Sequence, residues 1–360
     1  MDIKNTRIPV TLLTGFLGAG KTTLLNHLIK DENSGRIAVI MNEFGAAGLD
    51  HDLIEESTEE TVLMQSGCLC CTFRGDISTT LSSLLSRKTS GELSFDRVVI
   101  ETTGIAEPGP ILQTLSGDEL IKSDFYMDGV VTLVDAATGP DTLDTHMEAV
   151  NQIAMADLIV LSKSDLVTSD ELERFEAKIS SINNLAQQVR ADHGSVPVDT
   201  LFGLSATDQD GEVKDISKWV GKEVNMTTLM SSHAQPQGRQ EHKITSVSME
   251  FVDPIPGSIF DYWLDTLIAL NGPDILRMKG IVHVEGMECP FVFHGVQHIF
   301  DTPVPLENWS GEDTTSRIAV IARNISKEDL AASLEVLRVQ PNGVGALPEE
   351  LLAPAAATPF

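Results

Sequence analysis

Basic residues are scarce in this sequence. It has 25 Lys and Arg against 53 Asp and Glu, a net charge of −28 over 360 residues. Binding to duplex nucleic acid needs clustered cations that neutralise phosphates, so this composition argues against a nucleic-acid partner. It favours cationic ligands, metal ions included, although solubility alone can also account for such acidity.

Long apolar runs are also absent. No stretch approaches about 20 consecutive apolar residues, the length needed to span a membrane, so no membrane partner is expected. Residues 1–7 lack the apolar core of a signal peptide, and we therefore expect a cytoplasmic protein. With 42% hydrophobic residues the chain can bury a substantial core, and its length favours two domains.

Cysteine occurs only four times, and three of the four lie within four residues. Cys68, Cys70 and Cys71 form a C-x-C-C motif, whereas Cys289 stands alone and is expected to be a packed core thiol. Disulfides are rare in a reducing compartment, so the motif indicates a metal or redox site. A structural zinc site closes four ligands, so three thiolates favour a site that receives and releases a metal. Zinc is the expected ion and cobalt the alternative; without a metal, the motif would be a buried apolar cluster.

A phosphate-binding P-loop stands near the N-terminus. Residues 15–22 match G-x-x-x-x-G-K-[ST], with a strand-like run before them and a helical pattern after them, as the motif requires. Its glycines let backbone N–H groups point at phosphate oxygens. Lys21 is expected to reach the β- and γ-phosphates, and Thr22 to bind Mg²⁺ through its hydroxyl. The residues expected to contact the nucleotide here are Gly15, Gly18, Ala19, Gly20, Lys21, Thr22 and Thr23.

The order of the expected elements indicates the fold class. Strand-like runs alternate with helical ones, which predicts an α/β fold: a P-loop NTPase domain with a mostly parallel sheet, followed by a smaller α+β domain. In the first domain we expect strands at 36–41, 96–101, 130–134, 158–161 and 201–204, and helices at 76–85 and 169–183. In the second we expect strands at 243–252, 275–284, 290–300 and 316–323, a helix at 257–271, and a last helix capped by Ser326. The expected division is a P-loop domain over 1–224, a linker over 225–242, an α+β domain over 243–340 and a disordered tail over 341–360.

A second motif bears on the choice of nucleotide. Residues 162–165, Ser-Lys-Ser-Asp, resemble the N-K-x-D guanine box with Ser162 in place of Asn. The Asp165 carboxylate can accept hydrogen bonds from guanine N1–H and the 2-amino group, and the Lys163 stem can cover the base. Loss of the Asn is expected to weaken support of this loop. Ser205 and Ala206, after the strand expected at 201–204, complete the nucleotide-binding candidates.

Two acidic residues are expected at the same edge of the sheet. Glu101-Thr-Thr-Gly104 resembles the D-x-x-G switch, so Glu101 is expected to hold Mg²⁺ and Gly104 to turn its N–H toward a γ-phosphate. No glutamine follows Gly104 to orient an attacking water, so slow intrinsic hydrolysis is expected. Glu43, just past the strand at 36–41, is the candidate fourth ligand for the thiolate-bound metal.

Together these motifs resemble the CobW family of P-loop GTPase metallochaperones. The segments that carry the resemblance are residues 15–23, 42–45, 67–71, 101–108 and 162–165, with 276–281 and 316–321 resembling the CobW C-terminal domain. The resemblance spans roughly residues 8 to 338 and implies a protein that binds and hydrolyses GTP, binds a transition metal and delivers it to a client protein. Zinc delivery, cobalt supply for cobalamin biosynthesis and activation of nitrile hydratase-type enzymes all occur among such proteins.

Two other classes of function fit parts of the sequence. A P-loop phosphotransferase would need an acceptor pocket and would not need the cysteines. A nucleotide switch that recruits partners would use the cysteines only as structural residues. Titration with Zn²⁺ and Co²⁺, with and without GTP, separates these classes from a metallochaperone.

The guanine box generates a testable prediction. We expect the protein to bind GTP more tightly than ATP, and Asp165→Ala to flatten or reverse that preference, because guanine loses the acceptor for its N1–H and 2-amino group. Competition of each nucleotide against a fluorescent analogue measures both affinities. Equal affinity of the unsubstituted protein for GTP and ATP would show that Ser162 marks a lost guanine box.

Overall fold

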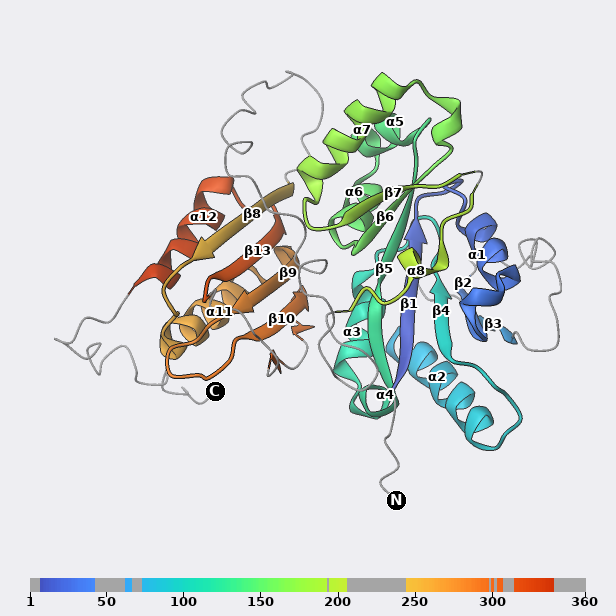
Figure 1. Cartoon of the computed structure of the whole chain (residues 1–360), viewed down its shortest axis with the longest axis horizontal. Helices are drawn as coiled ribbons and strands as arrows, with labels where there is room; N and C mark the ends of the chain where they lie inside the picture. The colour runs from blue at the N-terminus through green and yellow to red at the C-terminus, as the bar shows by residue number, and fades with distance from the viewer. Residues whose placement is uncertain are drawn as a thin grey trace, which may run out of the picture.

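The computed structural model places two units side by side (Figure 1). The first unit comprises residues 7–205 and the second residues 244–339. The structure describes residues 7–42, 62–66, 73–192, 194–205, 244–297, 299–300, 303–306 and 314–339. The expected linker and tail lie outside these residues, so the domain boundaries stay predictions. Among the described helices, none has the length and apolar character needed to cross a membrane.

A seven-stranded sheet forms the centre of the first unit, with strand order β3-β2-β4-β1-β5-β6-β7. Every neighbouring pair in it is parallel, as the expected α/β class requires. The strands are β1 (Ile8–Gly15), β2 (Ile37–Asn42), β3 (Val62–Ser66), β4 (Arg97–Glu101), β5 (Phe125–Asp135), β6 (Leu158–Ser162) and β7 (Gln187–Arg190). Their carboxyl ends therefore meet at one edge, where such sheets bind ligands.

Helices cover both faces of this sheet. They are α1 (Lys21–Lys30), α2 (Phe73–Thr89), α3 (Gly109–Gly117), α4 (Glu119–Asp124), α5 (Gly139–Thr145), α6 (Met147–Ala154), α7 (Ser169–Ile182) and α8 (Val198–Leu201). Alternate residues of β1 point to opposite faces, so Leu12 packs in the core beneath α2 and α3 while Leu13 packs in the core beneath α1. Helix α7 begins with a capping box in which Thr168 and Glu171 exchange hydrogen bonds.

The last strand of this sheet is not where the sequence predicts it. The strand expected at 201–204 is wrong: α8 ends at Leu201 and the next residues are irregular. The seventh strand is β7, which pairs with β6 at the edge of the sheet. Its sequence, Gln-Gln-Val-Arg, is polar and partly exposed because an edge strand is only half covered, so hydrophobic patterning does not reveal it.

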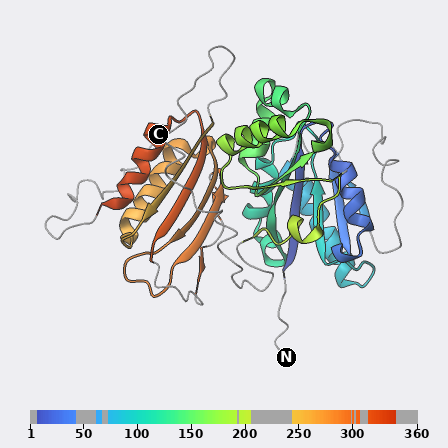
Figure 2. The same ribbon diagram turned by 45° about the horizontal axis from the view of Figure 1, so that its top comes forward.

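The second unit is an antiparallel sheet with two helices on one face. Its strands are β8 (Ile244–Phe251), β9 (Ile275–Val282), β10 (Phe291–Val296), β11 (Ile299–Phe300), β12 (Val304–Pro305) and β13 (Ser316–Arg323), and its helices are α11 (Gly257–Asn271) and α12 (Lys327–Glu335). Figure 2 shows both helices on the side away from the first unit. Ser326 caps α12 as predicted, accepting from the Asp329 N–H at 3.0 Å. The α+β class expected for this part is confirmed.

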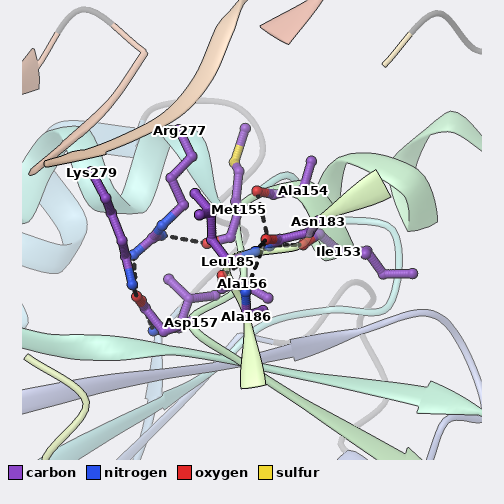
Figure 3. Close-up of polar contacts among 11 residues, drawn as sticks. Ile153, Ala154, Met155, Ala156, Asp157, Asn183, Leu185, Ala186, Arg277 and Lys279 are labelled. Carbon is purple, nitrogen blue, oxygen red and sulfur yellow. Dashed lines mark hydrogen bonds and ion pairs between the residues drawn. The ribbon is translucent and has the colours of Figure 1, made fainter. Parts of the chain in front are cut away.

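Buried charges join the two units (Figure 3). Arg277 and Lys279 of β9 both pair with Asp157, with Lys279 Nζ 2.7 Å from Asp157 Oδ1. Arg277 also donates to the Met155 carbonyl at 2.5 Å. Burial would raise the pKa of Asp157, but the charges of Arg277 and Lys279 outweigh it and hold that pKa well below its usual range. The three charges are therefore satisfied only when the units are docked.

Asn183 fixes the turn beside this ion cluster (Figure 3). The residue is fully buried and follows the end of α7. Its Nδ2 donates to the Ile153 and Ala156 carbonyls at 2.7 and 3.0 Å. Its Oδ1 accepts from the Leu185 and Ala186 N–H groups, each at 3.0 Å. One amide thus satisfies the backbone at the end of α6 and at the start of the segment that leads to β7.

We expect Asn183→Ala to lower the free energy of unfolding by about 2–4 kcal/mol, because several buried backbone groups lose their partner at once. Urea unfolding measures the change. Ser181→Ala is the matched control, since the Ser181 hydroxyl makes one exposed hydrogen bond to the Lys178 carbonyl and its loss should cost little. Equal stability of the two variants would contradict the role given to Asn183.

Candidate nucleotide-binding site

The P-loop lies between the end of β1 and the start of α1. Gly15 approaches β5 so closely that a Cβ there would lie 2.4 Å from the Leu133 carbonyl oxygen. Gly20 caps α1 at a φ of 96°, a left-handed conformation that favours glycine. The N-terminus of α1 therefore opens into the loop, where its free N–H groups and partial positive charge suit a phosphate.

Lys21 is held inside this loop. Its Nζ donates to the Gly15 and Phe16 carbonyls at 2.7 and 3.2 Å, and the residue is 8% exposed. The ammonium group therefore lies against the backbone of the loop, and its expected contact with the β- and γ-phosphates stays a prediction.

Thr22 and Glu101 form an oxygen pair suited to Mg²⁺. Thr22 Oγ1 donates to Glu101 Oε1 at 3.1 Å, and Glu101 is 6% exposed. The end of β4 is fixed beside β1, since the Thr102 N–H donates to the Leu13 carbonyl at 2.9 Å. A carboxylate and a hydroxyl at this separation are ligands that Mg²⁺ prefers, so these two residues fit the ion expected with a nucleotide.

Gly104 lies directly against the P-loop. A Cβ on Gly104 would lie 2.6 Å from the Leu17 backbone nitrogen, so no other residue fits without moving the loop. The structure thus brings the predicted switch segment to the phosphate loop. The side chains of Leu17 and Ile105 are exposed at this point.

Ser162 ties the base-binding segment to the P-loop. Its Oγ donates to the Ala19 carbonyl at 2.7 Å, although the two residues are 143 positions apart. The Ser162 hydroxyl thus reaches the P-loop directly, and the expectation that replacing Asn by Ser weakens this support stays a prediction. Asp165 follows in a 3₁₀ turn, Ser164–Leu166, and is exposed, as a base-reading carboxylate must be.

Asp135 is a residue of this site that the sequence analysis did not single out. It ends β5, and its Oδ2 accepts from Lys163 Nζ at 2.6 Å while its Oδ1 accepts from the Ala137 and Thr138 N–H groups. Burial would raise the pKa of Asp135, but the Lys163 ammonium and these N–H groups lower it overall. Lys163 has a φ of 54°, so this ion pair holds it in a turn conformation that is rare for lysine. An acidic residue directly after a buried strand is the signal that could have revealed Asp135.

The loop after β7 occupies the place expected for Ser205 and Ala206. Ala191 follows β7, and its N–H donates to the Leu161 carbonyl at 2.8 Å. A Cβ on Gly194 would lie 2.9 Å from the Thr23 Cγ2 atom, so this loop borders α1. Ser205 instead lines a cavity between the units with Arg277 and His294, and Ala206 lies outside the described residues. Ser205 was misplaced because β7 was missed.

The predicted metal ligands are not described by the structure. Glu43, Cys68, Cys70 and Cys71 all lie outside the described residues. Within the described part of the chain, no group of three or more His, Cys, Asp or Glu side chains could hold a metal ion. Cys289 is half-buried in the connection between β9 and β10 rather than in the core.

The strands that lead to these ligands end next to each other. Asn42, the last residue of β2, pairs with Ser66, the last residue of β3. Met41 pairs with Gln65 on one side and with Glu101 on the other. Glu43 and Cys68 follow the ends of β2 and β3 by one and two residues in the sequence. Of these two strands, β2 pairs with the strand that ends in Glu101.

Comparison with known proteins identifies the same two units. A family model for the CobW/HypB/UreG nucleotide-binding domain matches residues 9–190, and one for the cobalamin synthesis protein cobW C-terminal domain matches residues 244–338. The zinc chaperone YjiA of Escherichia coli is 31% identical over 335 residues, covering 92% of this chain and 99% of YjiA. The zinc-regulated GTPase metalloprotein activator 1 of Schizosaccharomyces pombe is also 31% identical, covering 89% of this chain and 83% of its own length. The crystal structure of Zn(II)-bound YjiA GTPase superposes with a TM-score of 0.72 at 28% identity, over 92% of this chain and 99% of that one.

We expect Ser162→Ala to weaken binding of GTP about three- to tenfold, the effect of one lost buried hydrogen bond between the base loop and the P-loop. Titration with a fluorescent guanine nucleotide measures this. Ser164→Ala is the control from the same loop, since the Ser164 hydroxyl makes only a 3.4 Å contact with the Ala191 carbonyl. An affinity for Ser162→Ala that matches the control would argue against this tie.

Proposed function

This chain belongs to the CobW/HypB/UreG family of nucleotide-binding proteins, and we propose that it is a GTP-hydrolysing metallochaperone that carries zinc to a client protein. The observation that carries the proposal is the order of strand ends: β2, which precedes Glu43 in the chain, pairs with β4, which ends in Glu101, and on its other side with β3, which precedes the cysteines. The described ends of β2, β3 and β4 lie at one edge of one sheet, which supports a metal site close to the nucleotide.

The nucleotide half of the proposal rests on the described residues. Lys21 lies in the phosphate loop, and Thr22 and Glu101 fit Mg²⁺, which when bound would neutralise charge on the β- and γ-phosphates. Asp165 is exposed for guanine, and Lys163 is held beside it by Asp135. The residue after Gly104 is Ile105 rather than glutamine, so we expect slow intrinsic hydrolysis. Two similar proteins that match most of the chain carry the word GTPase in their names, which supports hydrolysis of GTP.

The metal half rests on the C-x-C-C motif and on the relatives. Cys68, Cys70 and Cys71 supply three thiolates, and Glu43 is the candidate oxygen ligand. Zinc suits thiolates in a tetrahedral site, and three protein thiolates with one exchangeable position allow the ion to be passed on. Both relatives described above carry zinc in their names. Cobalt is the alternative cargo. The zinc-affinity measurement described below, repeated with Co²⁺, decides between the two metals.

Coupling between the two halves would turn nucleotide hydrolysis into metal release. A γ-phosphate and Mg²⁺ at Glu101 act on the strand next to β2, whose end leads to Glu43. If GTP changes the affinity for zinc by some factor, zinc must change the affinity for GTP by the same factor. A nucleotide switch with purely structural cysteines would show no such effect.

We expect zinc affinity to differ between the GTP-bound, GDP-bound and nucleotide-free protein by about 5- to 150-fold, the usual range of coupling between two sites. Competition with a chelating dye measures zinc affinity in each state. A variant with Cys68, Cys70 and Cys71 all changed to Ser is the control and should lose the tight zinc site. Identical affinity in all three states, or tight binding that survives in this variant, would overturn the proposal.

A further inference from the structure

Two side chains of α6 hold the loop that carries Gly104. Gln152 Nε2 donates to the Gly104 carbonyl at 3.2 Å and to the Ala106 carbonyl at 3.0 Å. Asn151 Nδ2 donates to Glu107 Oε1 at 2.9 Å. Both residues are 1% exposed, and the bond from Gln152 to the Gly104 carbonyl is buried. Three of the four loop residues 104–107, namely Gly104, Ala106 and Glu107, are thus tied to one turn of α6.

The loop is clamped on both sides of Gly104. On the strand side, the Thr102 N–H donates to the Leu13 carbonyl, and Thr102 Oγ1 donates to Thr14 Oγ1 at 2.8 Å. On the other side, Gln152 holds the carbonyl of Gly104 itself. Because a loop fixed at both ends has few conformations left, the direction of the Gly104 N–H is set by these two clamps.

The other amide atom of Gln152 is left without a hydrogen bond in the described part of the chain. Its Oε1 is buried and has no hydrogen-bond partner among the described residues. A buried unsatisfied acceptor costs free energy, so Gln152 makes its two bonds to the loop at some cost to stability. Gln152 also lines a cavity of about 20 Å³, which it shares with Phe16 and Leu17 of the P-loop. Gln152 therefore bonds to the loop at Gly104 and borders the same cavity as the P-loop.

Helix α6 has a further contact at each end. At its start, the His146 ring packs on the Phe16 ring of the P-loop, with centroids 4.6 Å apart. Just after its end, the Met155 carbonyl accepts from Arg277 of the second unit. The helix that positions the Gly104 loop is thus seated against both the P-loop and the second unit.

We propose that Gln152 is a positioning residue for GTP hydrolysis: through the Gly104 and Ala106 carbonyls, it fixes the loop whose N–H meets the γ-phosphate. The inference rests on the proposed GTPase function and adds to it a residue outside every motif of the sequence. The position of this loop matters for GTP and not for GDP, because GDP has no γ-phosphate for the Gly104 N–H to meet.

The test compares Gln152→Met with the unsubstituted protein. Methionine keeps the length of the side chain and removes the donor. We expect single-turnover hydrolysis of GTP to slow about tenfold, the effect of losing the two hydrogen bonds, and the ratio of GTP to GDP affinity to fall. Affinity for GDP should stay within about twofold, a pattern that a general loss of structure would not produce.

Gln188→Met is the matched control. Gln188 also donates two hydrogen bonds, to the Glu176 carbonyl and to Ser180 Oγ, and its Oε1 is likewise buried without a partner among the described residues. It lies on β7, outside the nucleotide site, so its loss should leave hydrolysis unchanged. Asn151→Leu serves as a second variant should Gln152→Met fail to fold, and we expect it to slow hydrolysis in the same direction with GDP affinity retained.

The outcomes separate this inference from the proposed function. If the unsubstituted protein hydrolyses GTP and Gln152→Met or Asn151→Leu hydrolyses it equally fast, the positioning role is overturned while the GTPase stands. Equal losses of GTP and GDP affinity in these variants would also overturn it, since they would show a purely structural role. An unsubstituted protein that binds but never hydrolyses GTP would instead overturn the proposed function.

Discussion

The candidate site depends on the parallel pairing of β1 with β4 on one side and with β5 on the other. This register sets the end of β1 beside Glu101 and beside Leu133, so the P-loop starts between an acidic strand end and a close backbone wall. The same pairing continues outward to β2 and β3, and through β6 to the base loop. A slip of one residue would turn the buried side chains of β1 to the opposite face and break both cores. The register that packs the two cores therefore also fixes which residues meet at the carboxyl edge of the sheet.

Within that frame, short polar side chains hold the loops together. Ser162 joins the base loop to the P-loop, Asp135 holds Lys163, and Gln152 holds the loop after β4. The side chains of Ser162, Asp135 and Gln152 are all buried, where an unmade hydrogen bond is costly. Such bonds fix the loops before any ligand arrives, which reduces the entropy that binding must overcome.

Sequence patterning predicted the parts of this molecule whose information is local. The P-loop, the buried strands β2, β4 and β6, and helix α11 follow from contiguous motifs or from hydrophobic periodicity. Edge strand β7 did not, because its sequence is polar and it is only partly covered, and this omission displaced the expected base loop to Ser205. The contact of Gln152 with Gly104 spans 48 residues and that of Arg277 with Met155 spans 122. No pattern in a single sequence marks such pairs, because each depends on how separate elements pack.

The ion cluster at Asp157 also bears on how such a protein can be assembled in evolution. Arg277 and Lys279 are buried against the first unit, and the apolar core that contains Leu276 and Ile321 continues into α3 and α6. A different P-loop domain without an acid at the Asp157 position would leave two desolvated cations facing it, at a cost of several kcal/mol. The second unit is therefore not a freely interchangeable module: it can be inherited only together with a nucleotide domain that carries the matching carboxylate.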